Sequence, residues 1–478
     1  MVALASSAGC GRIDYDAQDA GRDLDATSAL DVALPDAPGL DAPLPDAVLT
    51  LLDAPLPDAP LLDAPLLDAP APDAALAPDA FACPPGERLV MGRCVPPVRQ
   101  LDLDGDGIGD LVIGAQQAPP SAQGAAFFYR GSATGPVLID TFRTGNADER
   151  VGFAVVDAHD TNGDRLDDVI VSGHNFGAGS AYVFHGGSAS YATATSRLTA
   201  TPSSEFGQFL CGLGDVTGDA WADVVVAEDG AARLHLFRGR DVGLLTTPSA
   251  TLTAPDLQQI GDGGDVDGNG RGDVVLRGVT GTEGHLYVYL SLTSAPAMPS
   301  LTIRAGAGAT YTGLASARLD PDAAADVVVG TSDGTVRVHR GSATGPSAAA
   351  SATLATPMGA SAFGTVIANV GDLDADGDDE LAIASDVGGA ATVHVYAGQD
   401  ADPFATRATS IPLPSAAGRT RLSLGAADVD GDGLAELVVG DPTRQHVYLY
   451  ADPMGSPSLA YDLSDPSATA FGFSVASR

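Results

Sequence analysis

Short runs of apolar, mostly β-branched residues recur along the chain, and each run begins at an acidic residue. The runs read DLVIGA, DVIVSG, DVVVAE, DVVLRG, DVVVGT, ELAIAS and ELVVGD. Continuous apolar runs of this length are typical of short strands that are buried on both faces. The starting acids are separated by 58, 55, 50, 53, 54 and 56 residues, and they are Asp110, Asp168, Asp223, Asp273, Asp326, Glu380 and Glu436.

Two further strand patterns accompany these runs. A second apolar strand follows it, as in AYVFHGGSA, HLYVYLS and VRVHRGSATGP, and the phrase GSATGP occurs at both 131–136 and 341–346. A third strand, punctuated by glycine, precedes several runs, as in VGFAVV, FGQFL and FGTVIANV. A period of 50 to 58 residues built from short strands predicts an all-β fold, a β-propeller with one four-stranded blade per repeat.

The two ends of the array predict how the ring closes. The first acidic segment, which starts at Asp102, is preceded by PPVRQ and not by a Phe-Gly strand, whereas the chain ends on such a strand, FGFSVASR (471–478). A strand from each terminus can pair in one shared blade, which removes an exposed sheet edge. We therefore predict a seven-bladed propeller over residues 99–478; a linear array would instead need capping repeats.

The segment DLDGDGIGD (102–110) is the motif with the clearest chemistry. Acids at positions 1, 3, 5 and 9, with a main-chain carbonyl at position 7, can converge on one cation. Calcium prefers six to eight hard oxygen ligands, whereas transition metals favour His or Cys. The predicted calcium ligands are Asp102, Asp104, Asp106, Ile108 and Asp110; Asp160, Asn162, Asp164, Leu166 and Asp168; Asp215, Thr217, Asp219, Trp221 and Asp223; Asp265, Asp267, Asn269, Arg271 and Asp273; Asp372, Asp374, Asp376, Asp378 and Glu380; and Asp428, Asp430, Asp432, Leu434 and Glu436.

The loops are not equivalent in sequence. Position 6 is glycine in four of these six loops, but it is Arg165 in the second and Ala220 in the third. A positive φ there costs a residue with a Cβ roughly 1–2 kcal/mol, so we expect those two sites to be weaker. The fifth loop begins with Arg318, whose guanidinium is expected to take the place of an ion, so about six calcium sites are predicted. Its remaining positions are Asp320, Asp322 and Asp326.

Position 12 excludes an EF-hand or dockerin loop, because an EF-hand needs a bidentate acid there. The residues at that position are all apolar: Ile113, Val171, Val226, Leu276, Val329, Ile383 and Val439. A loop that closes at position 9 directly into a strand, after a Phe-Gly strand, resembles the FG-GAP repeats of integrin α chains, and the resemblance covers about 101–478. It implies that each loop joins the first two strands of a blade on one face of the ring. We expect the ions to be architectural; direct contact between an ion and a ligand is the alternative.

Charge and low complexity describe the rest of the chain. Acidic residues number 62 against 24 basic ones, a net charge of −38, which argues against nucleic acid as a partner. Residues 11–82 repeat Asp, Ala, Pro and Leu, as in DAPLPDAPLLDAP. Proline breaks regular structure and the acids repel one another, so this segment is predicted to be a disordered, acidic stalk.

The four cysteines are predicted to have different roles. Cys10 ends a short segment of small residues, 1–10, which we interpret as a lipoprotein-type signal with Cys10 as the acylated residue; a plain disordered terminus is the alternative. Cys83 and Cys94 are predicted to close the small loop 83–95 with a disulfide worth roughly 3 kcal/mol. Cys211 is expected to be a buried thiol. No apolar run approaches 18 residues, so no transmembrane span is predicted.

No catalytic motif accompanies these repeats. The sequence contains no HExxH, GxSxG or P-loop pattern, the histidines in the second repeated strands suit packing or hydrogen bonding, and the RGD at 271–273 is explained by its place in the fourth loop. We therefore expect a non-enzymatic, calcium-binding adhesion module for a protein or glycan, secreted or lipid-anchored at a bacterial surface. A hydrolase that uses the central channel and a purely structural surface protein are the alternatives.

Overall fold

A computed structural model describes most of the region predicted to form the propeller. Its described residues are 10–11, 88–90, 93–95, 100–117, 123–146, 149–174, 179–199, 205–228, 232–290, 292, 298–374, 376–398, 407–414, 421–465 and 468–477. The predicted signal segment apart from Cys10, the predicted stalk from residue 12 onward, and Cys83 lie outside these residues.

The described strands form seven blades, each an antiparallel sheet with neighbouring strands in chain order except in the first blade. The blades, from the inner to the outer strand, are β32 (Thr469–Ala476), β4 (Leu111–Gln117), β5 (Ala125–Arg130) and β6 (Val137–Phe142); β7 (Arg150–His159), β8 (Asp168–His174), β9 (Ser180–Phe184) and β10 (Ser196–Leu198); β11 (Phe206–Gly214), β12 (Asp223–Glu228), β13 (Arg233–Phe237) and β14 (Ala250–Thr253); β15 (Leu257–Gly264), β16 (Asp273–Thr280), β17 (Glu283–Tyr289) and β18 (Leu301–Arg304); β19 (Tyr311–Ala317), β20 (Asp326–Thr331), β21 (Val336–His339) and β22 (Ala352–Leu354); β23 (Ala360–Ser361) and β24 (Ile367–Gly371), both paired with β25 (Glu380–Val387), then β26 (Ala390–Tyr396) and β27 (Arg407–Pro412); and β28 (Ser423–Ala427), β29 (Glu436–Asp441), β30 (His446–Ala451) and β31 (Ser458–Ser464).

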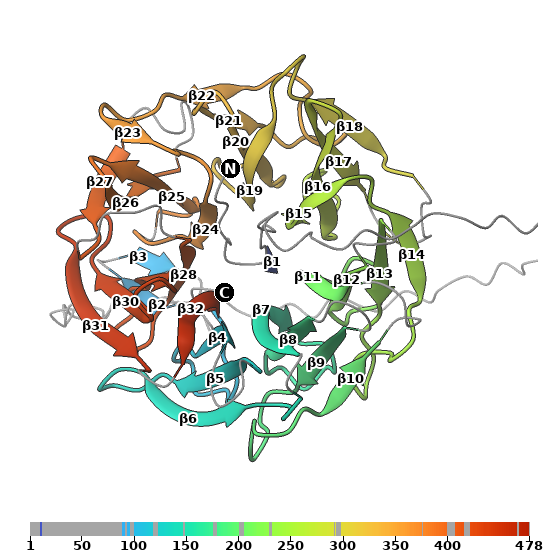
Figure 1. The fold of residues 1–478 in the computed structure, drawn as a ribbon, viewed down its shortest axis with the longest axis vertical. Coiled ribbons are helices and arrows are strands. Elements are labelled where there is room, and N and C mark those ends of the chain that lie inside the picture. Colours follow the sequence, from blue (N-terminus) through green and yellow to red (C-terminus); the bar gives the residue numbers. More distant parts are fainter. Residues whose placement is uncertain are drawn as a thin grey trace, which may run out of the picture. The chain divides into compact units, whose positions relative to one another are not determined.

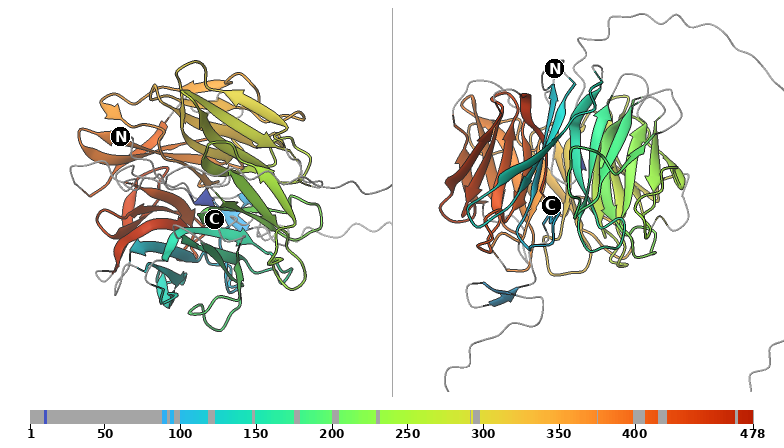
Figure 2. Two further views of the ribbon diagram at one scale, coloured as in Figure 1. Left: turned by 45° about the vertical axis from the view of Figure 1, so that its right-hand side comes forward. Right: turned by 90° about the horizontal axis from the view of Figure 1, so that it is seen from below.

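The blades follow one another around a ring, with the first strand of each blade nearest the centre (Figure 1). Seen edge-on in the right panel of Figure 2, the strands run from one face of the ring towards the other. Two short elements lie outside the blade pattern. They are β1 (Cys10–Gly11), which pairs with the inner strand β11, and a two-stranded ribbon of β2 (Arg88–Val90) and β3 (Arg93–Val95).

The first blade is assembled from both ends of the propeller, as the sequence predicts. Strand β32 pairs with β4, so that Phe471 lies opposite Ala115 and Val475 opposite Ile113. Phe471 is fully buried and meets Phe127 edge-on, with ring centroids 5.2 Å apart. The C-terminal strand therefore supplies both hydrogen bonds and apolar packing where the ring closes.

The core of the propeller lies between the blades and not within them. Seven apolar clusters each combine residues of two neighbouring blades. Val112 packs towards the second blade, while Leu111 and Ile113 pack towards the seventh. Because both faces of the second strand are covered in this way, its sequence is a continuous apolar run.

Glycines set the spacing between blades. A Cβ on Gly330 would lie 1.8 Å from the carbonyl oxygen of Gly364 in the next blade, which a backbone atom cannot accommodate. Gly364 belongs to a Phe-Gly pair and has a φ of 77°. The same close approach joins Gly114 to Gly152 and Gly440 to Gly472. This glycine, preceded by Phe363, by Phe471 or in the second blade by Val151, is therefore one point at which a blade's backbone contacts the next.

The described residues contain strands, turns and bends but no helix, in agreement with the predicted all-β class. Among these residues no helix has the length and the apolar character needed to cross a membrane.

Candidate metal-binding loops

The acidic loops all lie at the same end of the blades. In blades two, three, four, six and seven the loop leaves the innermost strand and its closing acid begins the second strand; in the first blade it leads from Leu101 into β4. This is the position that the family resemblance implies. The rest of each loop is a compact turn in which side-chain oxygens accept backbone amides.

The carboxylate at position 1 organises the turn in the same way in six loops. In the first loop, Asp102 Oδ2 accepts the amide of Gly107 at 3.0 Å, and Asp102 Oδ1 accepts that of Gly105 at 2.7 Å. The bond from the position-6 amide to position 1 recurs at 2.6–3.1 Å in the others, donated by Arg165, Ala220, Gly270, Gly377 and Gly433.

Position 6 adopts the left-handed conformation that such a turn requires. Its φ is 82° at Gly107 and also positive at the two residues with a Cβ, 72° at Arg165 and 75° at Ala220. Both carry the conformational cost that the sequence predicts. The second and third loops are therefore expected to close less favourably than the glycine-containing loops.

Position 7 completes the turn by bonding back to position 5. The amide of Ile108 donates to Asp106 Oδ1 at 2.9 Å, and that of Leu434 to Asp432 Oδ1 at 2.8 Å. The same bond is present at Leu166, Trp221, Arg271 and Asp378. The carbonyls of these six residues remain the predicted main-chain ligands.

The closing acid at position 9 ties the loop to its own blade. Asp110 is 2 % exposed, and its two oxygens accept the amides of Leu103 at 2.8 Å and Gly131 at 2.9 Å. Glu380 accepts Leu373 at 2.6 Å and Gly398 at 3.3 Å. The corresponding glycine at the end of the third strand also donates to Asp168, Asp223 and Asp326.

Burial makes these closing acids difficult to ionise without a nearby cation. Desolvation raises the pKa of Asp110 and Asp223 to about 7 and that of Asp168 to about 6. It raises the pKa of Glu436 to about 8 and that of Glu380 to about 9, and neighbouring loop carboxylates add to the effect. A cation in the loop would reverse this balance by stabilising the carboxylate form.

The donor set of the loops fits calcium. Carboxylate oxygens from three acids lie within 4.8 Å of one another in loops one, three, four and six. These groups are Asp102, Asp104 and Asp110; Asp215, Asp219 and Asp223; Asp265, Asp267 and Asp273; and Asp372, Asp374 and Glu380. The ligands are hard oxygens without imidazole or thiolate, which suits Ca²⁺ better than a transition metal.

Loops one, two, four, five and seven also contact the following blade through backbone hydrogen bonds. In loop one the carbonyls of Asp102 and Leu103 accept the amides of Asp167 at 3.1 Å and Gly187 at 2.6 Å, both in blade two. In loop seven the carbonyls of Asp428 and Val429 accept Gly109 at 2.7 Å and Ser132 at 3.0 Å, in blade one. Order in a loop is therefore transmitted to the interface between two blades, including the one that closes the ring.

The RGD tripeptide is part of the fourth loop's structure. Asp273 is 1 % exposed, and it accepts the amide of Val266 at 2.9 Å. Its carboxylate is directed into the loop and is not presented at the surface as an adhesion motif would require.

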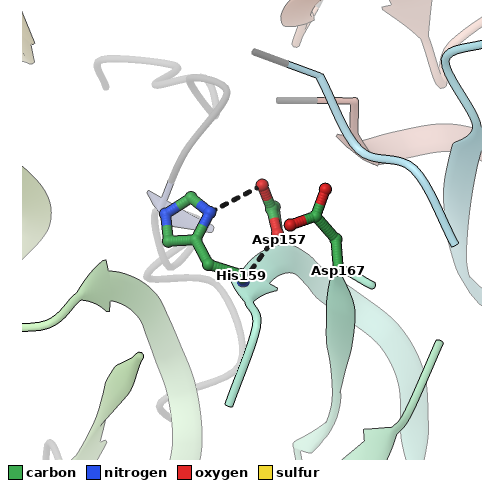
Figure 3. A group of neighbouring side chains, drawn as sticks. All are labelled: Asp157, His159 and Asp167. Atoms are coloured by element: carbon green, nitrogen blue, oxygen red, sulfur yellow. Dashed lines mark hydrogen bonds and ion pairs between the residues drawn. The ribbon is translucent and has the colours of Figure 1, made fainter. Parts of the chain in front are cut away.

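A second cluster, which sequence reasoning missed, lies beside loop two and contains Asp157, His159 and Asp167 (Figure 3). His159 Nδ1 is 2.9 Å from Asp157 Oδ2, and Asp167 Oδ2 accepts the amide of Asp102 at 3.0 Å. His159 has a φ of 57° at a place where Gly214 and Gly264 stand in blades three and four. The visible signal was the extra acid and imidazole flanking the second loop. The contacts assign the cluster to the junction of loops one and two.

The histidines of the third strands are hydrogen-bonded inside their own blades. His235 contacts Glu228 at 2.8 Å, and His394 lies between Ser385 at 2.7 Å and Ser410 at 2.8 Å. These bonds support the structural interpretation of the histidines, although they do not bridge neighbouring blades.

The expectation of a buried thiol at Cys211 is wrong, because Cys211 is disulfide-bonded. It lies in the inner strand β11, where Cys10 of β1 is its register partner. Cys94 lies in β3 opposite Leu89, while its predicted partner Cys83 is outside the described residues.

Comparisons with known proteins agree with the repeat pattern. A family model described as FG-GAP-like repeat matches residues 372–439, which include the sixth loop. Integrin alpha-PS5 of Drosophila melanogaster is 30% identical over 194 residues, covering 36% of this chain and 19% of that protein. Integrin alpha-6 of Gallus gallus is 29% identical over 171 residues, covering 34% of this chain and 15% of that protein.

The chain therefore spans less than a fifth of the length of these relatives. A solved structure titled as a putative 6-phosphogluconolactonase from Bacteroides uniformis matches with a TM-score of 0.51 at 11% identity, covering 77% of this chain and 100% of that one. This likeness shows the fold alone. The similarity to FG-GAP repeats and integrin α chains expected from the sequence is confirmed.

Proposed function

We propose, from the premise that the chain is an integrin-α-like propeller of FG-GAP-type repeats, that it is a calcium-dependent, non-enzymatic module that binds a protein or glycan outside the cytoplasm. The observation that carries the proposal is the repeated oxygen-donor loop, with the same turn hydrogen bonds in six blades. A fold that repeats an ion site around a ring and closes it with its own terminal strand is suited to present a rigid surface.

Calcium, when bound, supplies positive charge among carboxylates that otherwise repel one another. The chain's own residues shape and anchor the loop through hydrogen bonds. The position-1 acid stabilises the turn, and the closing acid connects the turn to its own blade. The first two backbone carbonyls of the loop connect it to the next blade. Metal binding is therefore expected to stiffen the interfaces between blades and so to fix the shape of the binding face.

The proposed location is supported by one feature of the structure. Disulfides form and persist in oxidising compartments, and Cys211 is in a disulfide. Acylation of the Cys10 sulfur remains a prediction, and it would exclude a disulfide from that same sulfur.

Ligand capture in the presence and absence of calcium tests the proposal. The full chain is immobilised and probed with a glycan array and with purified surface proteins, first in millimolar Ca²⁺ and then in EGTA. We expect at least one ligand class to bind, with affinity lowered about tenfold or more by EGTA as the blade interfaces loosen. Asp372→Asn, which weakens one loop, should reduce binding partially. Equal binding in both buffers, or catalytic turnover on a hydrolase substrate panel, would contradict the proposal.

A further inference from the structure

The fifth loop, 318–326, keeps three acids but only part of the turn that the other loops form. Its position-1 residue, Arg318, is exposed and cannot accept the amides that Asp102 accepts in loop one. Position 4 is Pro321, which has no amide to donate. At position 6 the other six loops have φ values of 72° to 105°, whereas Ala323 is not among the described residues with positive φ. The position-1 acceptor, the position-4 amide and the left-handed position 6 of the other turns are therefore missing together, while the amide of Ala324 at position 7 still donates to Asp322 at 2.9 Å.

A guanidinium occupies this loop from another part of the blade. Arg340, just after β21, forms an ion pair with Asp320, whose side chain is 5 % exposed. The next residue, Gly341, donates its amide to the closing acid Asp326 at 2.9 Å, as the equivalent glycines do in other blades. Arg340 is thus anchored beside the loop, with its charge at the position-3 carboxylate. The sequence prediction that Arg318 would supply this charge is wrong.

We propose that Arg340 permanently supplies the positive charge that calcium supplies in the other six loops, so that the fifth loop closes without metal. This inference rests on the proposed calcium binding of those loops. A guanidinium offers both charge and directed N–H donors to carboxylates, so it can hold an acidic turn that lacks the geometry for an ion.

The first blade provides an internal comparison. Arg130 also precedes a GSATGP turn, and its Nε lies 2.5 Å from Asp104 Oδ2, again at position 3 of its loop. Loop one, however, retains Asp102 at position 1 and positive φ at both Gly105 and Gly107. There the arginine is added to a loop in which Asp102, Asp104 and Asp110 already converge, since one carboxylate can contact a cation and a guanidinium through different oxygens. An arginine that precedes a GSATGP turn therefore lies beside a proposed metal loop in blade one, whereas in blade five it takes the place of the metal.

The fifth loop still performs the structural task of the others. Its Arg318 carbonyl accepts the amide of Asp379 in blade six at 2.7 Å. Blade five in turn donates the amide of Ala325 to the Asp265 carbonyl of loop four, also at 2.7 Å. The interface between blades five and six is therefore held without an ion, whereas its counterparts depend on calcium.

Calcium counting and two matched substitutions test the proposal on the full chain. Native mass spectrometry of the wild type in excess Ca²⁺ should show six ions per chain; seven would overturn the inference. Arg340→Met should keep six ions and lower the melting temperature by about 3 °C or more, equally in Ca²⁺ and in EGTA. Arg130→Met should also keep six ions, but any change in its melting temperature should depend on calcium.

Conversely, restoring the residues of a metal loop is expected to give the fifth loop a calcium site. Replacing Arg318→Asp, Pro321→Gly, Ala323→Gly and Arg340→Met together should create a seventh calcium site. An unchanged melting temperature for Arg340→Met in both buffers, or a loss confined to Ca²⁺, would overturn the inference. If the wild type binds no calcium, the proposed function fails, while the effect of Arg340→Met in EGTA still decides the role of this arginine.

Discussion

Deletion of β32, from Thr469 to the end of the chain, is expected to abolish cooperative folding of the propeller. The deletion removes the strand that completes blade one and leaves β4 as an unpaired inner edge. It also removes Phe471, Phe473 and Val475, each of which is at least 94% buried. Burial of one such side chain contributes about 1.5–3 kcal/mol, so the total approaches the whole stability of an ordinary domain. Urea unfolding followed by circular dichroism measures the effect.

A graded substitution separates packing from strand pairing. Phe471→Ala keeps the backbone of β32 but removes the ring that packs on Phe127, and it should cost about 3–5 kcal/mol while the transition stays cooperative. If the truncated chain melts within a few degrees of the intact one, closure by the terminal strand is not what stabilises the ring.

Calcium is expected to reverse the pH dependence of stability. In metal-stripped protein, burial raises the pKa of the closing acids above their unfolded values, to about 7 at Asp110 and about 9 at Glu380. A raised pKa favours the protonated folded state, so this contribution is fully present below the unfolded pKa and is lost as the pH rises through the folded one. The stripped protein should therefore melt at a lower temperature at pH 8.5 than at pH 5.

Calcium-saturated protein should show the opposite trend over the same range. Protons compete with the ion for the carboxylates, so the calcium contribution grows as the pH rises. Glu380→Gln is the matched control: it removes one acid of raised pKa and should flatten the decline of the stripped protein. A melting temperature that stays level or rises between pH 5 and pH 8.5 in the metal-stripped wild type would contradict the raised pKa of these buried acids.

Much of this architecture could be predicted because its signals are local and repeated. Each blade can be recognised by an acid at the start of an apolar run. The C-terminal strand FGFSVASR, which has no acidic loop after it, indicates how the ring closes. The turn chemistry was also local, since alternating acids and a residue of positive φ lie within nine positions. Even the strained residues Arg165 and Ala220 could be recognised from their position in the motif.

The features that could not be predicted are contacts between residues that come together only in the folded protein. Arg340 forms an ion pair with Asp320 across its blade. The sequence analysis instead predicted that Arg318 would supply this charge, because Arg318 lies within the motif. Asp157 and Asp167 meet across a loop, with His159 where other blades use glycine. Cys211 has a disulfide partner although no nearby sequence pattern paired it. The packing of loops within a blade decides the first two contacts, and the alternating acids of the motif do not encode it.

Thermal unfolding of the full chain in excess Ca²⁺ and in EGTA tests the central claim most directly. Each site that is saturated at about 100 times its Kd stabilises the folded state by about 2.7 kcal/mol, so several sites together should raise the melting temperature by more than about 10 °C. Magnesium at the same concentration should have a smaller effect, because it keeps its waters and demands octahedral geometry. Identical melting temperatures in Ca²⁺ and EGTA would show that the acidic loops do not bind calcium and would contradict the account.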